Sequence, residues 1–325
     1  MAWMLLRIIL AIFLNGCVIF SVSALEDKPR IALLTNKYYT KEAEKLSSEI
    51  VKIQNAEIDI KFVGYDFSPC SIDEDLRSYD LIVSLGRRGL QRALCYDREN
   101  PIYSIFISKS HYKSTLAKYN SSQLEAKNKK QISALYIEQS INNHALFLKA
   151  VSKFMHEPLR AGVILGENTV NSKEEILESS AKLGIDLEIY EVSESEEPAD
   201  VLKSLLAEHN LILAIPDYGV FDKHNARGML MLAFANHIPV IGYNQATTRS
   251  GALASLYTPK YKQIREASTI IAKIIKGKPL ILPEEKHPDA FSIAINNTVK
   301  NRLMPELANS SVIYDILKQD LSNEE

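Results

Sequence analysis

The sequence predicts an α/β protein whose parallel sheets are divided between two lobes. Short apolar runs alternate with amphipathic stretches along the chain, a pattern typical of βαβ units. The length of 325 residues corresponds to about two domains. A polar segment, residues 117–130, separates two sets of elements of comparable size. This segment is either a surface helix or the approach to a crossing between lobes, and we expect a second sheet to begin near Ile132.

The first set of elements starts with a buried strand at residues 31–34. Ala43, Leu46, Ile50 and Ile53 recur at helical spacing, so a helix is expected over Thr40–Ile53. Residues 58–63 alternate as a half-buried strand does. Further apolar runs, which we interpret as strands, cover residues 81–83, 103–107 and 133–137.

The second set repeats the same alternation of strands and helices. We expect its strands at residues 161–165, 187–190, 211–214 and 239–242. The helices between them are expected at residues 172–183, 199–207 and 223–236. Because a helix separates each pair of successive strands, both sets favour parallel sheets.

The loops that follow the strands are the expected place for a ligand in an open α/β sheet. Here most of these loops are polar or aromatic rather than catalytic in composition. We predict ligand contacts from four of their residues, which are Ser108, Gln139, Tyr243 and Asn244. The loops cover residues 36–39, 86–88, 108–110, 138–139, 166–169, 216–218 and 243–244.

Two arginines, Arg87 and Arg88, follow an apolar run and open a helical pattern directly after Gly86. The free N–H groups and positive potential of a helix N-terminus suit a carboxylate or phosphate. An arginine at this place adds a planar, two-pronged donor. We therefore predict that Arg87 contacts the acidic group of a ligand; the alternative is that both arginines face solvent.

Asp217 and Tyr218 follow the strand expected at residues 211–214. A carboxylate at such a strand end binds an amine, and a neighbouring aromatic ring packs on the apolar part of a ligand. We predict both residues as ligand contacts. The alternative is that Asp217 caps the next helix or forms an Asx turn.

The sequence carries no local signature of a metal, nucleotide-cofactor or nucleophile site. Its 12 glycines include no G-x-G spacing, and no G-x-x-x-x-G-K-[ST] loop occurs. The seven histidines form neither H-x-H nor H-E-x-x-H, and a G-x-S-x-G elbow is lacking. A formal net charge of −2 argues against a nucleic-acid partner. We therefore expect a protein that uses no cofactor or metal and is not an enzyme.

Residues 1–24 are interpreted as an export signal. Arg7 is the only charged residue of this segment, an apolar stretch follows it, and Val22 and Ala24 fit a signal-peptidase site. The alternatives are an uncleaved membrane anchor and a lipoprotein attached through Cys17. All three interpretations export the protein, so we expect it in the periplasm or otherwise outside the cytoplasm.

Export changes the interpretation of the cysteines. Without Cys17 the chain keeps Cys70 and Cys95, an even pair in an oxidising compartment. A disulfide between them would stabilise the fold by roughly 3 to 4 kcal/mol in the chain-entropy model. Two unpaired buried thiols are the alternative, and the sequence favours neither.

Several motifs follow one another in the second half of the chain. Residues 214–221 read AIPDYGVF, residues 238–243 read IPVIGY and residues 250–257 read SGALASLY. Gly277-Lys278-Pro279 then precedes a closing strand expected at residues 291–296. In order and spacing, these motifs resemble the ABC transporter substrate-binding protein family that includes tryptophan- and tyrosine-type binding proteins. The likeness covers residues 132–303, and in the family the segment that corresponds to SGALAS starts a helix.

This resemblance implies a type I periplasmic-binding fold, in which two Rossmann-like lobes are joined by three crossings and close around a small ligand. Lobe one would comprise residues 25–131 plus 252–279, and lobe two residues 132–251 plus 280–325. The match places Asp217, Tyr243 and Gly251 near the ligand. The first-lobe motifs of the family are replaced here, for example near Ser108, which makes the chain a divergent member whose ligand cannot be carried over.

We expect an exported solute-binding protein that captures a small polar, amino-acid-like ligand by hinge closure and delivers it to a membrane permease. One alternative is a periplasmic sensory subunit that signals through a membrane partner. A second alternative is an enzyme on a flavodoxin-like scaffold, which the lack of a nucleophile–base pair or metal set disfavours.

Overall fold

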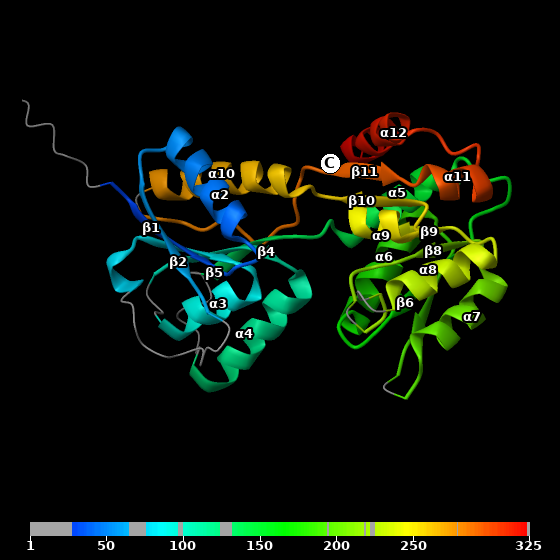
Figure 1. Cartoon of the computed structure of the whole chain (residues 1–325), viewed down its shortest axis with the longest axis horizontal. Coiled ribbons are helices and arrows are strands. Elements are labelled where there is room, and N and C mark those ends of the chain that lie inside the picture. Colours follow the sequence, from blue (N-terminus) through cyan, green and yellow to red (C-terminus); the bar gives the residue numbers. More distant parts are fainter. Residues whose placement is uncertain are drawn as a thin grey trace, which may run out of the picture.

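The computed structural model describes residues 28–64, 76–96, 100–123, 132–193, 195–217, 219–221, 225–277 and 279–323. The predicted export signal, Cys70 and Tyr218 lie outside these ranges. The described chain forms two α/β lobes that lie side by side, each built on its own sheet (Figure 1). Within the described ranges, no helix combines the length and the apolar character that crossing a membrane requires.

The first lobe contains a five-stranded parallel sheet in the order β2-β1-β3-β4-β5. All residues of β3 and β4 are buried, as expected for strands covered on both faces. The strands are β1 (Arg30–Thr35), β2 (Glu57–Phe62), β3 (Leu81–Leu85), β4 (Ile102–Ile107) and β5 (Ile132–Tyr136).

Helices cover both faces of this first sheet. Alternate residues of β1 point to opposite sides, so Ile31 packs with α2 (Thr40–Ile53) and α10 (Lys260–Lys276). Ala32 packs on the other side, with α3 (Gly86–Tyr96) and α4 (Lys109–Gln123). Helix α10 thus completes the first lobe although it follows most of the second lobe in sequence (Figure 1).

The second lobe contains a six-stranded sheet in the order β11-β10-β9-β8-β6-β7, in which only β11 is antiparallel. Helices α5, α6 and α12 pack on one face, and α7 and α8 on the other. The strands are β6 (Ala161–Leu165), β7 (Leu187–Glu191), β8 (Leu211–Leu213), β9 (Val240–Gly242), β10 (Ala254–Tyr257) and β11 (Ser292–Ile295). The helices are α5 (Ile141–Ser152), α6 (Lys173–Leu183), α7 (Pro198–Glu208), α8 (Ala226–Ala235), α9 (Gln245–Ser250), α11 (Asn297–Leu303) and α12 (Ser310–Ser322).

The two sheets share one strand order. Counted within its own lobe, the parallel part of each sheet runs second, first, third, fourth, fifth. In this order the chain direction switches between the first and third strands, which are β1 and β3 in the first lobe and β6 and β8 in the second. Ligands of open α/β sheets bind outside the carboxyl ends of the strands at such a switch point.

Several sequence predictions are confirmed by these elements. Helix α2 spans the predicted residues Thr40–Ile53, and β6 spans the predicted residues 161–165. Helix α3 opens directly after β3, as the Gly86-Arg87-Arg88 pattern predicted. Helix α4 takes in the first part of the polar segment 117–130, which agrees with its interpretation as a surface helix.

Other predictions were wrong. The second sheet does not begin near Ile132, because β5 pairs in parallel with β4 and its Leu135 completes the first core. Residues 254–257 lie in the second sheet, as β10 between β9 and β11, rather than in the first lobe. The segment after Gly251 does not start a helix: Gly251, with φ of 130°, ends α9, and the chain then enters β10.

Candidate functional site

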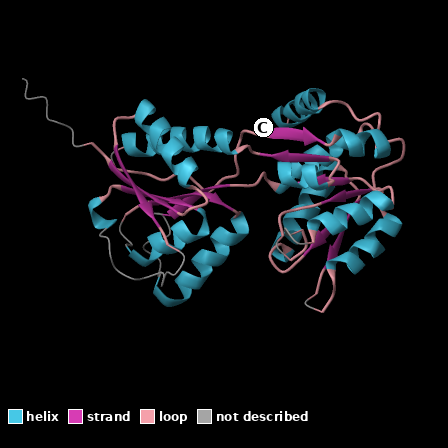
Figure 2. Cartoon of the chain, in the orientation of Figure 1, coloured by secondary structure: helices cyan, strands magenta, loops and turns pink. Residues whose placement is uncertain are grey.

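The carboxyl edges of the two parallel sheets face each other, and we refer to them as the facing edges. Strand β5 ends at Tyr136, and the next residues lead into α5 of the second lobe. Strand β10 ends at Tyr257 and leads back into α10 of the first lobe. Each lobe is therefore left from the carboxyl end of a parallel strand. A third crossing, between Lys286, which pairs with β5, and strand β11, completes the connection (Figure 2).

Gln139 ties these three crossings together. It lies in the first crossing and is 2% exposed. Its Nε2 donates to Thr258 Oγ1 of the second crossing at 2.6 Å, and lies 3.1 Å and 3.3 Å from the carbonyl oxygens of Pro288 and Ala290 in the third. Its Oε1 accepts from Asn143 Nδ2 at 2.8 Å. The polar atoms of this predicted ligand residue are therefore engaged by α5 and by the other two crossings.

Glu138, the residue before Gln139, places a buried carboxyl group in the first crossing. Its Oε1 accepts from the backbone N–H of Lys109 at 2.7 Å, whereas its Oε2 is buried and has no partner among the described residues. Burial raises the pKa of Glu138 to about 7, although the Lys109 N–H acts in the opposite direction. The carboxyl group therefore titrates near neutral pH.

Two histidines lie near the crossings. His287 Nδ1 is 2.9 Å from the carbonyl oxygen of Glu138, and burial lowers the pKa of its ring. His144 of α5 is 1% exposed, and burial lowers its pKa to about 4. Lys109 Nζ forms an ion pair with Glu175 of α6 at 2.7 Å, which joins the two lobes directly. Both side chains of this pair are 39% exposed, so its contribution to stability is small.

Arg87 lies at the switch point of the first sheet. Gly86 has φ of 73°, and a Cβ at this position would stand 2.8 Å from the ring of Tyr39, so the chain enters α3 by a turn that suits glycine. The Nε of Arg87 is buried and has no hydrogen-bond partner among the described residues. Burial and the charge of Arg87 together lower the pKa of His111, which places positive potential at this edge. This is the electrostatic environment that an anionic group needs.

Aromatic and hydroxyl groups complete the first facing edge. Tyr39 stacks on Phe106, with ring centroids 5.3 Å apart. Phe106 has φ of 55° beside a register shift in β4, a strained conformation of the kind that clusters at functional sites. Ser108 directly precedes α4, and its Oγ accepts from the backbone N–H of His111 at 3.2 Å.

Asp217 lies at the switch point of the second sheet, but its carboxylate is fully engaged and 2% exposed. Oδ2 accepts from Thr169 Oγ1 at 2.6 Å and from the Gly166 N–H at 3.2 Å. Oδ1 accepts from the Gly219 N–H at 2.7 Å and from Asn168 Nδ2 at 3.4 Å. Asp217 therefore holds the loop after β6 against the loop after β8, which resembles the Asx-turn alternative more than a free ligand contact.

Tyr243 and Asn244 also lie at the second facing edge, directly after β9. The Tyr243 hydroxyl donates to the Phe221 carbonyl oxygen at 2.8 Å. Asn244 caps α9, with its Oδ1 accepting from the Thr247 N–H at 2.8 Å in a capping box. Both side chains thus support the edge through bonds within the lobe.

None of the other predicted positions that the structure describes lies at the facing edges. Gly251 precedes β10, so it lies at the amino end of that strand, away from the facing edges, and its contact with a ligand stays a prediction. Tyr218, the predicted neighbour of Asp217, is outside the described ranges. Cys95 is disulfide-bonded, but Cys70 is not described, so their pairing stays a prediction. In the described part of the chain, no cluster of side chains suits a metal ion.

A family comparison bears on the second lobe. Residues 163–308 match the family model described as ABC transporter substrate binding protein. These residues run from β6 to the loop before α12. The second lobe is therefore similar to the ABC transporter substrate-binding protein family. A search of curated proteins finds no match to the chain.

Solved structures extend the likeness to both lobes. A substrate-binding protein with adhesive properties from Clostridium difficile, in its ligand-free, open structure, shares 19% identity at a TM-score of 0.63, over 85% of this chain and 94% of that one. The ABC domain in complex with L-Trp from Streptococcus pneumonia shares 15% identity at a TM-score of 0.56, over 85% and 94%. A conserved domain protein from Vibrio cholerae shares 15% identity at a TM-score of 0.55, over 89% and 98%. At these identities the likeness establishes the type I periplasmic-binding fold.

Proposed function

We propose that this chain is an exported solute-binding protein that captures a small polar ligand between its lobes by hinge closure and delivers it to an ABC transporter. The observation that carries the proposal is the pair of facing edges, each presenting its own switch point to the other lobe across three crossings. Movement about Gln139 would bring the two edges together on the ligand. The match of the second lobe to the substrate-binding family supports the same function.

We assign the acidic group of the ligand to Arg87. The N-termini of α3 and α4 lie after neighbouring strands of the first sheet, and both offer N–H groups and positive potential. The buried Nε of Arg87 lacks an acceptor among the described residues, and a carboxylate would supply one. The Ser108 hydroxyl stands at the start of α4 and offers a neutral contact.

The ligand class remains amino-acid-like in this proposal, but it now depends on the acidic end of the molecule. Asp217 already accepts from donors of its own lobe, so we do not expect it to bind an amine without breaking those bonds. Its role in the proposed function is to fix the shape of the second facing edge.

Export and a membrane partner complete the proposal. The apolar segment up to Ala24, with Arg7 as its only charge, supports secretion by a signal peptide. The partner would be a permease driven by an ATPase, because the second lobe matches the model of ABC transporter substrate-binding proteins.

Thermal-shift screening of the chain without residues 1–24 tests the proposal. A ligand with a Kd of about 1 μM, present at about 1 mM, adds roughly 4 kcal/mol to the free energy of unfolding. At about 2 °C per kcal/mol, the expected rise in Tm is roughly 8 °C. The panel consists of amino acids, organic acids, nucleosides and sugars. A panel without any response argues against solute binding.

The same screen tests the site. Arg87→Ala is expected to abolish the shift, and Arg92→Ala, which removes an arginine five residues further along α3, is expected to retain it. An unchanged shift in Arg87→Ala would refute the assignment of the acidic group while leaving solute binding intact.

A further inference from the structure

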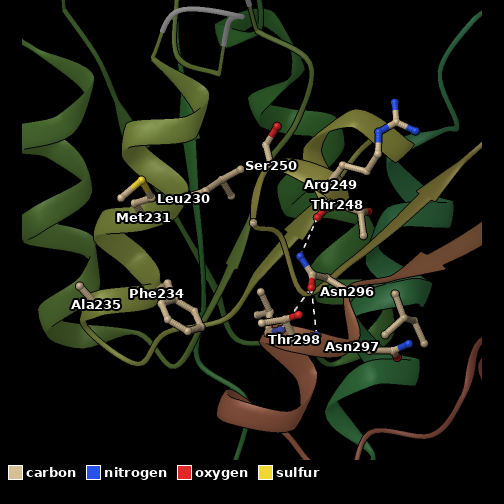
Figure 3. A pocket seen from close by; sticks show the side chains of 13 residues that line it. Leu230, Met231, Phe234, Ala235, Thr248, Arg249, Ser250, Asn296, Asn297 and Thr298 are labelled. Atoms are coloured by element: carbon tan, nitrogen blue, oxygen red, sulfur yellow. Dashed lines mark hydrogen bonds between the residues drawn. The ribbon is translucent and has the colours of Figure 1, made fainter.

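A second hollow lies in the second lobe, away from the facing edges. It is a groove of about 900 Å³ framed by α8, by α9 and by the turn from β11 into α11 (Figure 3). Gly251, at the end of α9, lines it and precedes the amino end of β10. The groove therefore lies at the amino edge of the second sheet, whereas the proposed solute site lies at its carboxyl edge, so an occupant of the groove does not compete with the solute.

The floor and one wall of this groove are apolar. Leu230 and Val299 are buried beneath it, at 1% and 5% exposure. Met231 and Phe234 stand on the α8 wall and are 60% and 37% exposed. Large apolar side chains gathered around a hollow, rather than scattered singly, mark an interaction site. Methionine adds an adaptable surface, because its side chain is flexible and polarisable.

Three arginines lie on the helices that frame the groove. Arg249 comes from α9 and extends away from the hollow (Figure 3). Arg227 lies one turn before Met231 on α8, and Arg302 lies one turn after Thr298 on α11. All three arginines are exposed. None of the segments 226–235, 245–251 and 295–303 contains an acidic residue, although the whole chain carries a net charge of −2.

We propose that this groove docks an acidic segment of a partner protein, which inserts an apolar side chain between α8 and α11 and places its carboxylates against the three arginines. Apolar anchoring at the centre and charge complementarity at the rim are the features of such recognition. The partner differs from the solute, so the proposal does not rest on the proposed function.

The shape of the groove favours a protein segment over other occupants. A bilayer surface is bound by apolar side chains that protrude, whereas these line a hollow. A small molecule needs polar groups that converge on it. Here Asn296 donates to the Thr248 carbonyl oxygen and accepts from two N–H groups of α11, so its polar atoms are already engaged. The arginines come from three different helices that frame the groove, which suits a chain with several carboxylates.

Fluorescence anisotropy with a synthetic probe tests the proposal. The probe is a labelled amphipathic peptide with Leu and Phe on one face and Glu on the other, and its counterpart carries Lys in place of Glu. We expect saturable binding of the Glu peptide, little binding of the Lys peptide, and at least fivefold weaker binding at 0.3 M than at 0.05 M salt. Arg249→Glu combined with Arg302→Glu is expected to weaken binding at least tenfold.

A control variant separates the groove from general electrostatics. Lys41→Glu combined with Lys45→Glu makes the same change in net charge on exposed positions of α2, in the other lobe. This variant is expected to bind the Glu peptide within twofold of the wild type. Met231→Ser is expected to weaken binding at least threefold without a change of charge, and because Met231 is exposed the fold is retained, which circular dichroism checks.

Three outcomes overturn the proposal. One is the absence of saturable binding by the Glu peptide. A second is an equal loss of affinity in the α2 control, which would mean that net charge alone drives association. The third is binding to phosphatidylglycerol vesicles that depends on Arg249 and Arg302 while the peptide does not bind, which would make the patch a membrane contact.

Discussion

Replacing Gln139 by alanine should loosen the hinge as well as destabilise the fold. The wild-type side chain can donate two hydrogen bonds from Nε2 and accepts one from Asn143, and its partners lie in α5 and in the second and third crossings. Each such bond contributes about 1 kcal/mol net, so Gln139→Ala should lower the free energy of unfolding by about 3 kcal/mol. At about 2 °C per kcal/mol this corresponds to a fall in Tm of roughly 6 °C.

Differential scanning calorimetry and small-angle X-ray scattering measure the two consequences. Gln263→Ala is the matched control, because Gln263 is also buried, and among the described residues its side chain donates only to the Tyr136 carbonyl oxygen, within the first lobe. Gln139→Ala should increase the radius of gyration, and Gln263→Ala should lower Tm without that increase. The hinge role is refuted if Gln139→Ala changes Tm by less than about 1 °C, or if both variants expand equally.

Three further predictions concern stability, measured by urea or thermal unfolding. The pKa of Glu138 rises from 4.5 to about 7 on folding, so the stability that its protonated form contributes is lost as the pH rises through this range. The pKa of His144 falls from 6.5 to about 4 on folding, so the stability that its neutral form contributes is lost as the pH falls through that range. Glu138→Gln removes the effect of Glu138 alone, so its free energy of unfolding should rise relative to that of the wild type by up to about 3 kcal/mol between pH 5 and pH 8. A difference that does not change with pH would contradict the burial of the carboxyl group. Asp217→Asn should lose about 2 kcal/mol, because an NH₂ group replaces an acceptor among donors; a loss below about 0.5 kcal/mol would contradict its structural role. Gly242→Ala should lower the free energy of unfolding by about 2 kcal/mol, since its Cβ would stand 2.2 Å from a threonine hydroxyl. Gly228→Ala, in an open helical position, should raise it by about 0.5 kcal/mol. Changes of the same sign in both variants would contradict the packing at Gly242.

Elements with strong local patterns could be predicted from the sequence. The helical spacing of Ala43, Leu46 and Ile50 fixed α2, because these residues alone form its buried face. The place of β5 could not be predicted, since an apolar run between two sets of elements fits the edge of either sheet. Its assignment to the first lobe depends on pairing with β4, which is a tertiary contact.

The sequence predicted where the candidate site residues lie better than what their side chains do. Arg87 and Asp217 both lie at switch points, where the alternation of strands and helices placed them. The hydrogen bonds that occupy the Asp217 carboxylate could not be predicted from the sequence, because their donors, Gly166 and Thr169, precede Asp217 by about 50 residues. Gln139 likewise meets Thr258 at a separation of 119 residues. The only local signal for its place in the hinge was Ser140, a helix cap that follows directly after it.

The most direct test of the account is a scattering titration with the compound that gives the largest thermal shift. If the ligand binds at the facing edges and closes the lobes, the radius of gyration should fall saturably, with the Kd obtained from the thermal shift, and Arg87→Ala should show no fall. Binding without contraction, or a contraction that Arg87→Ala retains, would contradict the account.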